Sequence, residues 1–451
     1  MVENAVQPPD PAAILRSRNF LVLLVLAAAV GVFVSLASWG FLELVHRTQI
    51  GVFTNLPSAL GFSEVPWWWP LPVLGLAGLP VAFAIVRLPG AGGHLPANGL
   101  QMGGSEPNMV PGIALAAFAT LCLGLVLGPE APLIAIGGGL AVFAVKQAKK
   151  DAPPQLLVVV GAAGAFAAIS VIFGSPIVAA ILVIEATGLG GATLSLILIP
   201  GLIAAGIGSL VFIGMSDWTG LSTSAYSLVP LQVPAFTHPT WTEISWTIAI
   251  GIAAAIVTVP IRRLGLKTAA FVPKKPFVII PGVGLAVASI AIIFDQISGK
   301  GVNQVLFSGQ DALPGLVANA GAWSVGALIL LFVCKGAAWG LSLGSFRGGP
   351  TFPAIFLGAA AGIAASHLPG MATTPALAVG MGAMVVAFLK LPLSAIVIAT
   401  MLTAPGGTAS VPLIIVGVVV AYLATLGLEG RLGTGSTDAG DSTTTPTGTE
   451  P

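Results

Sequence analysis

One carboxylate, Glu130, lies in a long apolar stretch of the chain. It belongs to the segment Gly-Leu-Val-Leu-Gly-Pro-Glu-Ala-Pro, which covers residues 124–132. A charged group at membrane depth costs about 3 to more than 10 kcal/mol, so such a group normally faces a water-filled path or a partner. The position of Glu130 therefore predicts a functional residue rather than a packing residue.

A related arrangement returns at residues 340–353 without the acid. There Gly-Leu-Ser-Leu-Gly is followed by Ser-Phe-Arg-Gly-Gly-Pro-Thr-Phe-Pro. The two Gly-Leu-X-Leu-Gly segments are 216 residues apart (124 to 340), and the apolar segments that begin at Pro176 and Pro392 have the same separation. Two anchors with one offset predict an internal duplication. Repeats in transporters usually have inverted topology and bind their substrate at the repeat interface.

Both copies of the motif are expected to begin a helix inside the membrane. Gly and Pro stop one helix, and the apolar pattern restarts at Pro132 and at Pro353. A helix start presents unpaired N–H groups and the positive end of a dipole, which attract anions. Two such ends that meet at mid-membrane would hold an anion without a full positive charge. A third glycine cluster, at Gly92 and Gly93, could supply another such turn or could be an ordinary connection.

The composition identifies the chain as an integral membrane protein. Of its 451 residues, 56% are hydrophobic and 7% are charged, compared with about 25% charged in a soluble domain. Apolar runs long enough for helical spans recur, and 58 Gly and 35 Pro interrupt many of them. Broken helices at membrane depth occur where they line a cavity or are buried in protein. We expect an all-α polytopic protein with re-entrant half-helices.

Charge sets the expected topology. Basic residues cluster at 146–150 and at 262–275, and Arg16 and Arg18 precede the first span. The positive-inside rule places both clusters and the N-terminus in the cytoplasm. The expected organisation of this multi-pass cell-membrane protein is a cytoplasmic leader (1–19), a first membrane repeat (20–221), a connecting segment (222–242), a second membrane repeat (243–428) and a disordered tail (429–451).

Three motifs resemble those of the CLC family of chloride channels and chloride/proton antiporters. Gly128-Pro-Glu-Ala-Pro resembles the family's Gly-x-Glu-Gly-Pro, Gly349-Pro-Thr-Phe-Pro is similar to Gly-x-Phe-x-Pro, and Gly92-Gly-His-Leu-Pro lies where the family has Gly-Ser-Gly-Ile-Pro. The resemblance implies a CLC-type fold of two inverted-topology repeats and a homodimer with an anion pathway in each subunit. It implies that Glu130 is the gate. The implied anion-binding residues are Gly92, Gly93, Gly128, Pro129, Gly348, Gly349, Thr351 and Phe352.

The chain departs from the family pattern at several positions. The family's anion-coordinating serine falls on Gly93, and Pro350 has no N–H to donate. Thr351 occupies the phenylalanine position of the motif and could offer a hydroxyl. Tyr422 belongs to the last predicted helix, whereas the family tyrosine lies beyond that helix. Glu185 matches the first of two adjacent family acids, so it is either part of a proton pathway or an acid at a helix end near the cytoplasm.

We therefore expect transport of chloride or a similar small anion through a pathway gated by Glu130, with protons as a second candidate substrate. One alternative is a carrier for another anion or solute on the same scaffold, and another is a membrane scaffold that transports nothing. The spans contain no His/Glu metal cluster and no Ser/His pair, which argues against an enzyme. We expect neither cofactor nor metal, no nucleic-acid partner, and contact with the lipid bilayer.

Overall fold

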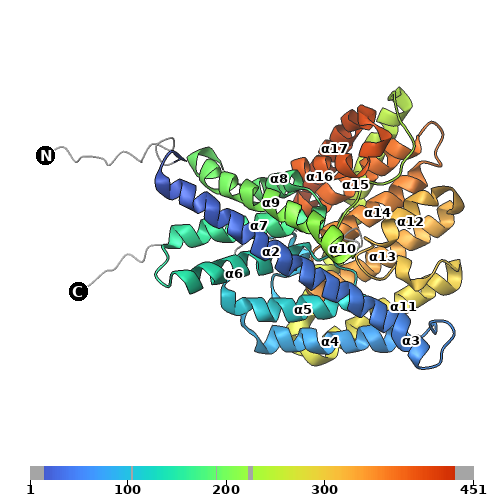
Figure 1. The fold of residues 1–451 in the computed structure, drawn as a ribbon. Helices are drawn as coiled ribbons and strands as arrows, with labels where there is room; N and C mark the ends of the chain where they lie inside the picture. The colour runs from blue at the N-terminus through green and yellow to red at the C-terminus, as the bar shows by residue number, and fades with distance from the viewer. Residues whose placement is uncertain (1–14, 103–104, 189, 222–226, 432–451) are drawn as a thin grey trace, which may run out of the picture.

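The computed structural model describes residues 15–102, 105–188, 190–221 and 227–431. Its regular elements are helices (Figure 1), joined at one point by an isolated two-residue β-bridge. The first-half helices are α2 (Arg18–Ile50), α3 (Leu56–Ala59), α4 (Pro70–Arg87), α5 (Val110–Cys122), α6 (Glu130–Ala148), α7 (Pro154–Phe173), α8 (Pro176–Thr187) and α9 (Gly191–Thr219). The second-half helices are α10 (Trp241–Phe271), α11 (Pro276–Ser298), α12 (Ala312–Ala318), α13 (Val325–Ser345), α14 (Thr351–Ala365), α15 (Thr373–Leu389), α16 (Pro392–Leu402) and α17 (Val411–Arg431).

Short turns connect these helices. They are a π-turn, η1 (Gly51–Asn55), and the 3₁₀ turns η2 (Pro89–Gly92), η3 (Pro96–Asn98), η4 (Pro107–Met109), η6 (Val272–Lys274), η7 (Val302–Gln304), η8 (Ala320–Ala322), η9 (Ala404–Gly406) and η10 (Thr408–Ser410).

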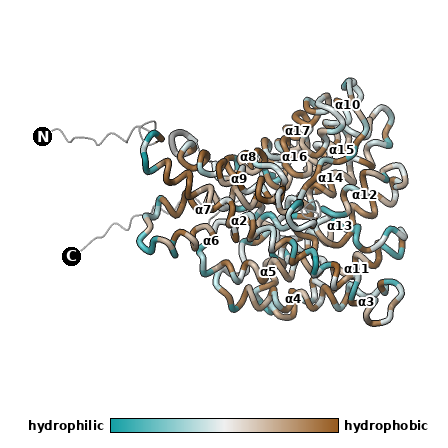
Figure 2. Tube along the Cα trace, in the orientation of Figure 1, coloured by the Kyte–Doolittle hydropathy of each residue, from teal (hydrophilic) through white to brown (hydrophobic). Residues whose placement is uncertain are grey.

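Helix lengths confirm the predicted polytopic, all-helical architecture. In the described part of the chain, 9 helical segments are long and apolar enough to cross a membrane. Others are apolar but shorter than the roughly 20 residues that a span requires: α8 has 12 residues, α14 has 15 and α16 has 11. Figure 2 shows hydrophobic residues running along the helices, with hydrophilic residues gathered mainly at turns and helix ends. The short helices are the predicted half-helices.

Local sequence explains where the half-helices begin. Before α8, Gly174 adopts a left-handed conformation with φ of 60°, and the Ser175 side chain accepts a hydrogen bond from the backbone of Val178. Pro176 and Pro392 are the first residues of α8 and α16. Proline suits a helix start, because it lacks an N–H that would have no helical partner there. Both segments of the predicted pair, 216 residues apart, are thus helices that begin at the proline.

The same offset fails at the central motif. Residues 340–344 lie inside α13, whereas residues 124–128 follow α5 in an irregular segment. The residues paired in space are Gly128 and Gly349, which are 221 positions apart. The second half has additional residues between its Gly-Leu-Ser-Leu-Gly and the Gly-Pro that precedes the helix. Aligning the two Gly-Leu-X-Leu-Gly segments as structural equivalents was therefore wrong.

Helices from the two halves pack directly against each other. The first-half helices α4 and α8 contact α11 and α16 of the second half, respectively. In Figure 1, α4 and α11 lie along the lower edge of the molecule. Close approach of these two helices depends on glycine, since a Cβ at Gly284 would meet the carbonyl oxygen of Leu74. Small residues of this kind allow membrane helices to approach closely.

Some boundaries differ from the expected ones. The α17 helix continues through residue 431, because Glu429 is buried and forms ion pairs with Arg262 and Lys390. The predicted tail therefore overlaps the helix at 429–431, and residues 432–451 lie outside the described part. The helix α10 begins at Trp241, inside the expected connecting segment, and residues 222–226 of that segment are also outside the described part. Residues 1–14 of the predicted leader are outside it too.

The α4–α11 contact gives a stability prediction. We expect Gly284→Ala to destabilise the protein by about 1–3 kcal/mol, because the new methyl group overpacks a helix contact made of backbone atoms. Gly282→Ala is the matched control on the same helix, since a Cβ there meets nothing within 4 Å. The midpoint of thermal unfolding in detergent is the measurement. Equal midpoints for the two variants would contradict the packing described here.

Candidate functional site

The two halves meet at a pair of glycines. Gly128 and Gly349 exchange backbone hydrogen bonds, with N···O distances of 2.7 and 2.6 Å, and form an antiparallel bridge. Each glycine is followed by a proline and then by a helix, α6 in the first half and α14 in the second. The bridge therefore holds the starts of α6 and α14 beside each other.

Glycine is required at both bridge positions because the Glu130 side chain fills the space beside them. A Cβ at Gly349 would overlap the carboxyl group of Glu130. A Cβ at Gly128 would also overlap this carboxyl group and would approach Phe352 to 2.9 Å. The backbone of the bridge is thus one wall of the Glu130 site.

Glu130 is the first residue of α6 and is completely buried. Its Oε1 atom accepts a hydrogen bond from the backbone N–H of Thr351, which is the first residue of α14. The carboxylate thus begins one helix and lies on the N-terminus of another. Unpaired N–H groups and helix dipoles favour negative charge at such a position. The sequence predicted a helix restart in each motif, at Pro132 and at Pro353. The structure begins these helices two residues earlier, at Glu130 and Thr351.

Two polar atoms at this site lack hydrogen-bond partners. Within the described residues, neither Oε2 of Glu130 nor Oγ1 of Thr351 has one, although both atoms are buried. A buried polar atom without a partner costs about 1–3 kcal/mol, and a charged one costs more. Such atoms are explained by a missing water, proton or ion, or by a catalytic or transport role.

Aromatic and proline residues enclose the site. Phe352 is buried and stacks on Phe173 with ring centroids 5.7 Å apart. Pro129 and Pro350 occupy the position immediately before α6 and α14. Because neither proline has an N–H, the first backbone donor at the start of α14 is Thr351.

The Gly92–Gly93 turn lies beside the second-half motif through Arg347. Both glycines have left-handed φ angles, 72° and 103°. A Cβ at Gly92 would lie 3.4 Å from Cγ of Arg347. Gly348, the next residue after Arg347, packs on Leu127 and the backbone of Gly128. The structure thereby gathers the predicted residues into two neighbouring groups, one around Glu130 and one around the Gly92–Gly93 turn.

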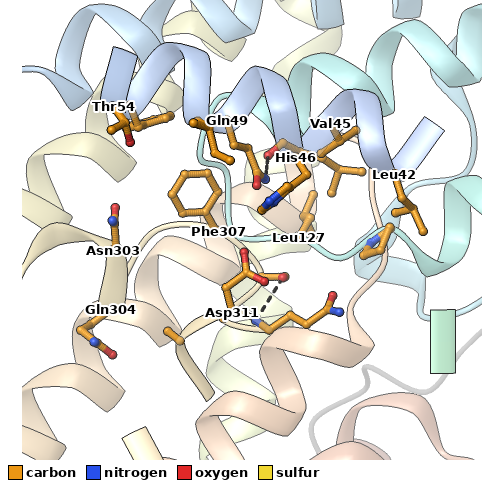
Figure 3. A pocket seen from close by; sticks show the side chains of 18 residues that line it. Leu42, Val45, His46, Gln49, Thr54, Leu127, Asn303, Gln304, Phe307 and Asp311 are labelled. Carbon is orange, nitrogen blue, oxygen red and sulfur yellow. Dashed lines mark hydrogen bonds between the residues drawn. The ribbon is translucent and has the colours of Figure 1, made fainter. Parts of the chain in front are cut away.

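A cavity of about 420 Å³ reaches the residues just before Glu130. We call it the vestibule. Leu127 and Pro129 form one part of its wall, and the rest comes from α2 and from residues 303–312. Its polar lining includes His46, Gln49, Asn303, Gln304, Gln310 and Asp311. Figure 3 shows that His46 and Asp311 point toward each other across this space.

The vestibule holds one carboxyl group with a shifted pKa. Burial raises the pKa of Asp311 above its ordinary value, and the charge of His46 partly offsets this increase. A carboxyl group with a raised pKa takes up a proton at a higher pH than an exposed aspartate does. The charge inside the vestibule consequently depends on pH.

Glu185 lies at a different junction of the two halves. Its carboxylate accepts hydrogen bonds of 2.7 Å from the backbone N–H groups of Leu393 and Ser394 and from the Ser394 hydroxyl. These are groups in the first turn of α16, so Glu185, which belongs to α8, caps a second-half helix. In the described residues no hydrogen bond or ion pair joins Glu185 to Glu130.

Sequence reasoning missed three residues of this region. Arg347 was visible as the one charged residue inside the second motif. His46 and Asp311 carried no motif, because they are far apart in the sequence and only the packing of α2 against residues 303–312 brings them together. No cluster of three or more metal-binding side chains occurs in the described residues.

Comparison with known proteins shows which family and fold this chain shares. Residues 97–426 match the model of a family described as voltage gated chloride channel. The protein named "Putative ion-transport protein YfeO" from Escherichia fergusonii is 29% identical over 351 residues, which is 76% of this chain and 78% of that protein. The protein of the same name from Escherichia coli O139:H28 is 30% identical over 349 residues, with the same coverage.

Solved structures share the fold at lower identity. A slow cyanobacterial Cl⁻/H⁺ antiporter has a TM-score of 0.75 at 19% identity, with 91% of this chain and 95% of that chain covered. A eukaryotic CLC transporter has a TM-score of 0.68 at 16% identity, with coverages of 91% and 72%. A CLC-type fluoride/proton antiporter has a TM-score of 0.63 at 14% identity, with coverages of 90% and 96%.

The matched family model, the relatives and the fold lead to one conclusion. This chain is a multi-pass anion transport protein rather than an enzyme, and it belongs to the CLC family of voltage-gated chloride channels and transporters.

Proposed function

We propose that the protein carries chloride or a similar small anion across the cell membrane along a pathway gated by Glu130. The observation that supports this most strongly is the hydrogen bond between the Glu130 carboxylate and the backbone N–H of Thr351. The carboxylate occupies the start of α14, where a free anion would also bind. Glu130 and the transported anion therefore compete for the same binding site at the start of α14.

Protonation of Glu130 makes this binding site available to the anion. An ionised carboxylate is held by the N–H groups and dipoles of two helix starts. A protonated carboxyl group has lost the charge that this attraction acts on, so its side chain is released more easily. The buried Thr351 N–H can then donate to the anion, and the unpaired Thr351 hydroxyl offers a second donor.

The vestibule serves as the outer entrance in this proposal. Helix α6 begins at Glu130 and ends beside Lys146, Lys149 and Lys150. The positive-inside rule puts this basic end in the cytoplasm. The vestibule lies at the opposite end of α6, next to Pro129, and so faces the outside. The same rule places the beginning of α2 in the cytoplasm.

We assign Glu185 the role of a helix cap rather than a proton carrier. Its carboxylate already accepts three hydrogen bonds from the first turn of α16, including two from backbone N–H groups. A proton-carrying cycle would have to break and remake these bonds. Each hydrogen bond to a charged group contributes about 1.5–3 kcal/mol, which favours a carboxylate that stays in place.

A homodimer through α8, α9, α16 and α17 is part of the proposal. Neighbouring helices in this set are in contact, and they expose large apolar side chains. Examples are Ile177 on α8, Leu210 on α9, Leu393 on α16 and Leu423 on α17. A second copy would cover these side chains in place of lipid.

The gate is tested with Glu130→Gln, which mimics the protonated side chain. We expect faster anion efflux from proteoliposomes near neutral pH and loss of most of the pH dependence, because the competing charge is gone. Glu64→Gln, in an irregular exposed segment, is the control and should behave as wild type. If Glu130→Gln left both the flux and its pH dependence unchanged, the gating role would be refuted.

The vestibule charge is tested with Asp311→Asn. Because the pKa of Asp311 is raised, its carboxylate loses its negative charge at a higher pH than an exposed aspartate does. At a pH above that pKa, the charged carboxylate repels anions. The variant should therefore lower the half-saturating external anion concentration about two- to fivefold at neutral pH and low ionic strength.

The matched control for this variant is Asp151→Asn, which removes an exposed aspartate next to the basic end of α6. Asp311→Asn and wild type should converge at acidic pH, where Asp311 is protonated in the wild type. An unchanged half-saturating concentration at neutral pH would show that Asp311 does not face the entering anion.

A further inference from the structure

Arg347 is a buried cation whose charge no described residue neutralises. The residue is only 8% exposed, and none of the described carboxylates forms an ion pair with it. The guanidinium donates two hydrogen bonds, from Nε to the Ala91 carbonyl at 3.2 Å and from Nη1 to the Phe346 carbonyl at 3.1 Å. An arginine has five N–H donors, so three N–H groups of Arg347 remain for another partner.

The position of Arg347 connects it to the anion site. It directly precedes Gly348 and Gly349, and Gly349 pairs with Gly128 beside Glu130. Its backbone N–H donates to the Thr120 hydroxyl at the end of α5, at 3.3 Å. Its stem packs beside Gly92. The guanidinium thus lies where the Gly92–Gly93 turn, the end of α5 and the loop before the bridge meet.

Two neighbouring positions, Gly93 and Pro350, offer no free backbone donor. Gly93 has no side chain, and its own N–H already donates to the Gly90 carbonyl at 2.8 Å. Pro350 has no N–H at all. The Ala91 carbonyl faces the guanidinium and would repel an anion on its own. The three remaining N–H groups of Arg347 supply donors beside this turn.

Energetics favour an anion as the missing partner. A buried charge without a counterion costs several kcal/mol even after relaxation of the protein. Two carbonyl acceptors only partly compensate for the lost hydration. A small anion beside Arg347 would supply both the counter-charge and the acceptors for its remaining N–H groups.

We infer that Arg347 binds the transported anion beside the Gly92–Gly93 turn and makes this site prefer small planar oxyanions, such as nitrate, to spherical halides. The inference rests on the proposed function, because it concerns the same pathway. The guanidinium is a planar group with a fixed arrangement of donors that matches two oxygens of one ligand. A spherical halide cannot use that arrangement as fully.

A structural role for Arg347 would have different consequences. In that case its purpose is to hold the Ala91 carbonyl, and a side chain that can still donate one hydrogen bond should suffice. Arg347→Gln keeps a donor and removes the charge. Arg347→Lys keeps the charge and removes the planar guanidinium group. The two variants therefore distinguish three contributions of Arg347: its positive charge, its planar arrangement of donors and its hydrogen bond to the Ala91 carbonyl.

The test compares nitrate and chloride in proteoliposomes made with wild type, Arg347→Gln and Arg347→Lys. Arg87→Gln, which removes an exposed arginine at the end of α4, is the control. The half-saturating concentration is measured for each anion, and size-exclusion profiles establish that the variants are folded.

We expect wild type to show the lower half-saturating concentration for nitrate. Arg347→Gln should raise the nitrate value at least about tenfold, and Arg347→Lys should abolish the preference for nitrate over chloride while keeping the chloride value within about threefold. Folded variants with wild-type values for both anions would overturn the inference and leave the proposed function standing. Absence of flux of either anion in the wild type would instead refute the proposed function.

Discussion

The structure depends on a hydrogen bond between a carboxylate and a helix start that belong to different halves of the chain. Glu130 begins α6 and accepts from the backbone N–H of Thr351 at the start of α14. This bond requires two helices that begin inside the protein, close together, with no Cβ on the two residues that lie beside the carboxylate. The Gly128–Gly349 bridge provides this, because any Cβ at either glycine would collide with Glu130.

Much of the fold follows from bringing those two helix starts together. Helices that begin inside the membrane region leave unpaired backbone groups, which must be buried in protein or face a cavity. At this site the starts of α6 and α14 are buried in protein, since Glu130, Thr351 and Phe352 expose almost no surface. Direct α4–α11 and α8–α16 contacts tie the halves together at two further places. At the second of these places, Glu185 caps α16 across the boundary between the halves, as Glu130 does for α14.

Charge along the proposed pathway differs from what helix ends alone would provide. Two helix starts offer only partial positive charges. Arg347 adds a full positive charge beside the Gly92–Gly93 turn, while Glu130 and Asp311 add acidic groups on the side toward the vestibule. The sequence of groups from the vestibule inward is therefore a titratable entrance, a carboxylate at the helix starts and a buried guanidinium. Such an order would let pH control entry and let Arg347 control selectivity.

The sequence was sufficient to predict the helical membrane fold and a helix start in each copy of the motif, with the acid Glu130 beside the first. Both predictions rest on local rules: Gly and Pro end and begin helices, and an acid in an apolar run needs a polar surrounding. It could not give the pairing of Gly128 with Gly349, because inserted residues in the second half change the offset between the repeats. It also could not reveal the His46–Asp311 pair, whose members meet only through tertiary packing. Arg347 was visible in the motif, but its burial and missing counter-charge were not.

The most direct test of the central claim follows chloride efflux and internal pH together in liposomes that contain the purified protein. We expect chloride efflux well above that of empty liposomes, with a rate that increases as the pH is lowered and Glu130 becomes protonated. Proton uptake against its own gradient during that efflux would contradict the capping role assigned to Glu185. Absence of any chloride efflux, with nitrate equally immobile, would contradict the claim that Glu130 gates an anion pathway.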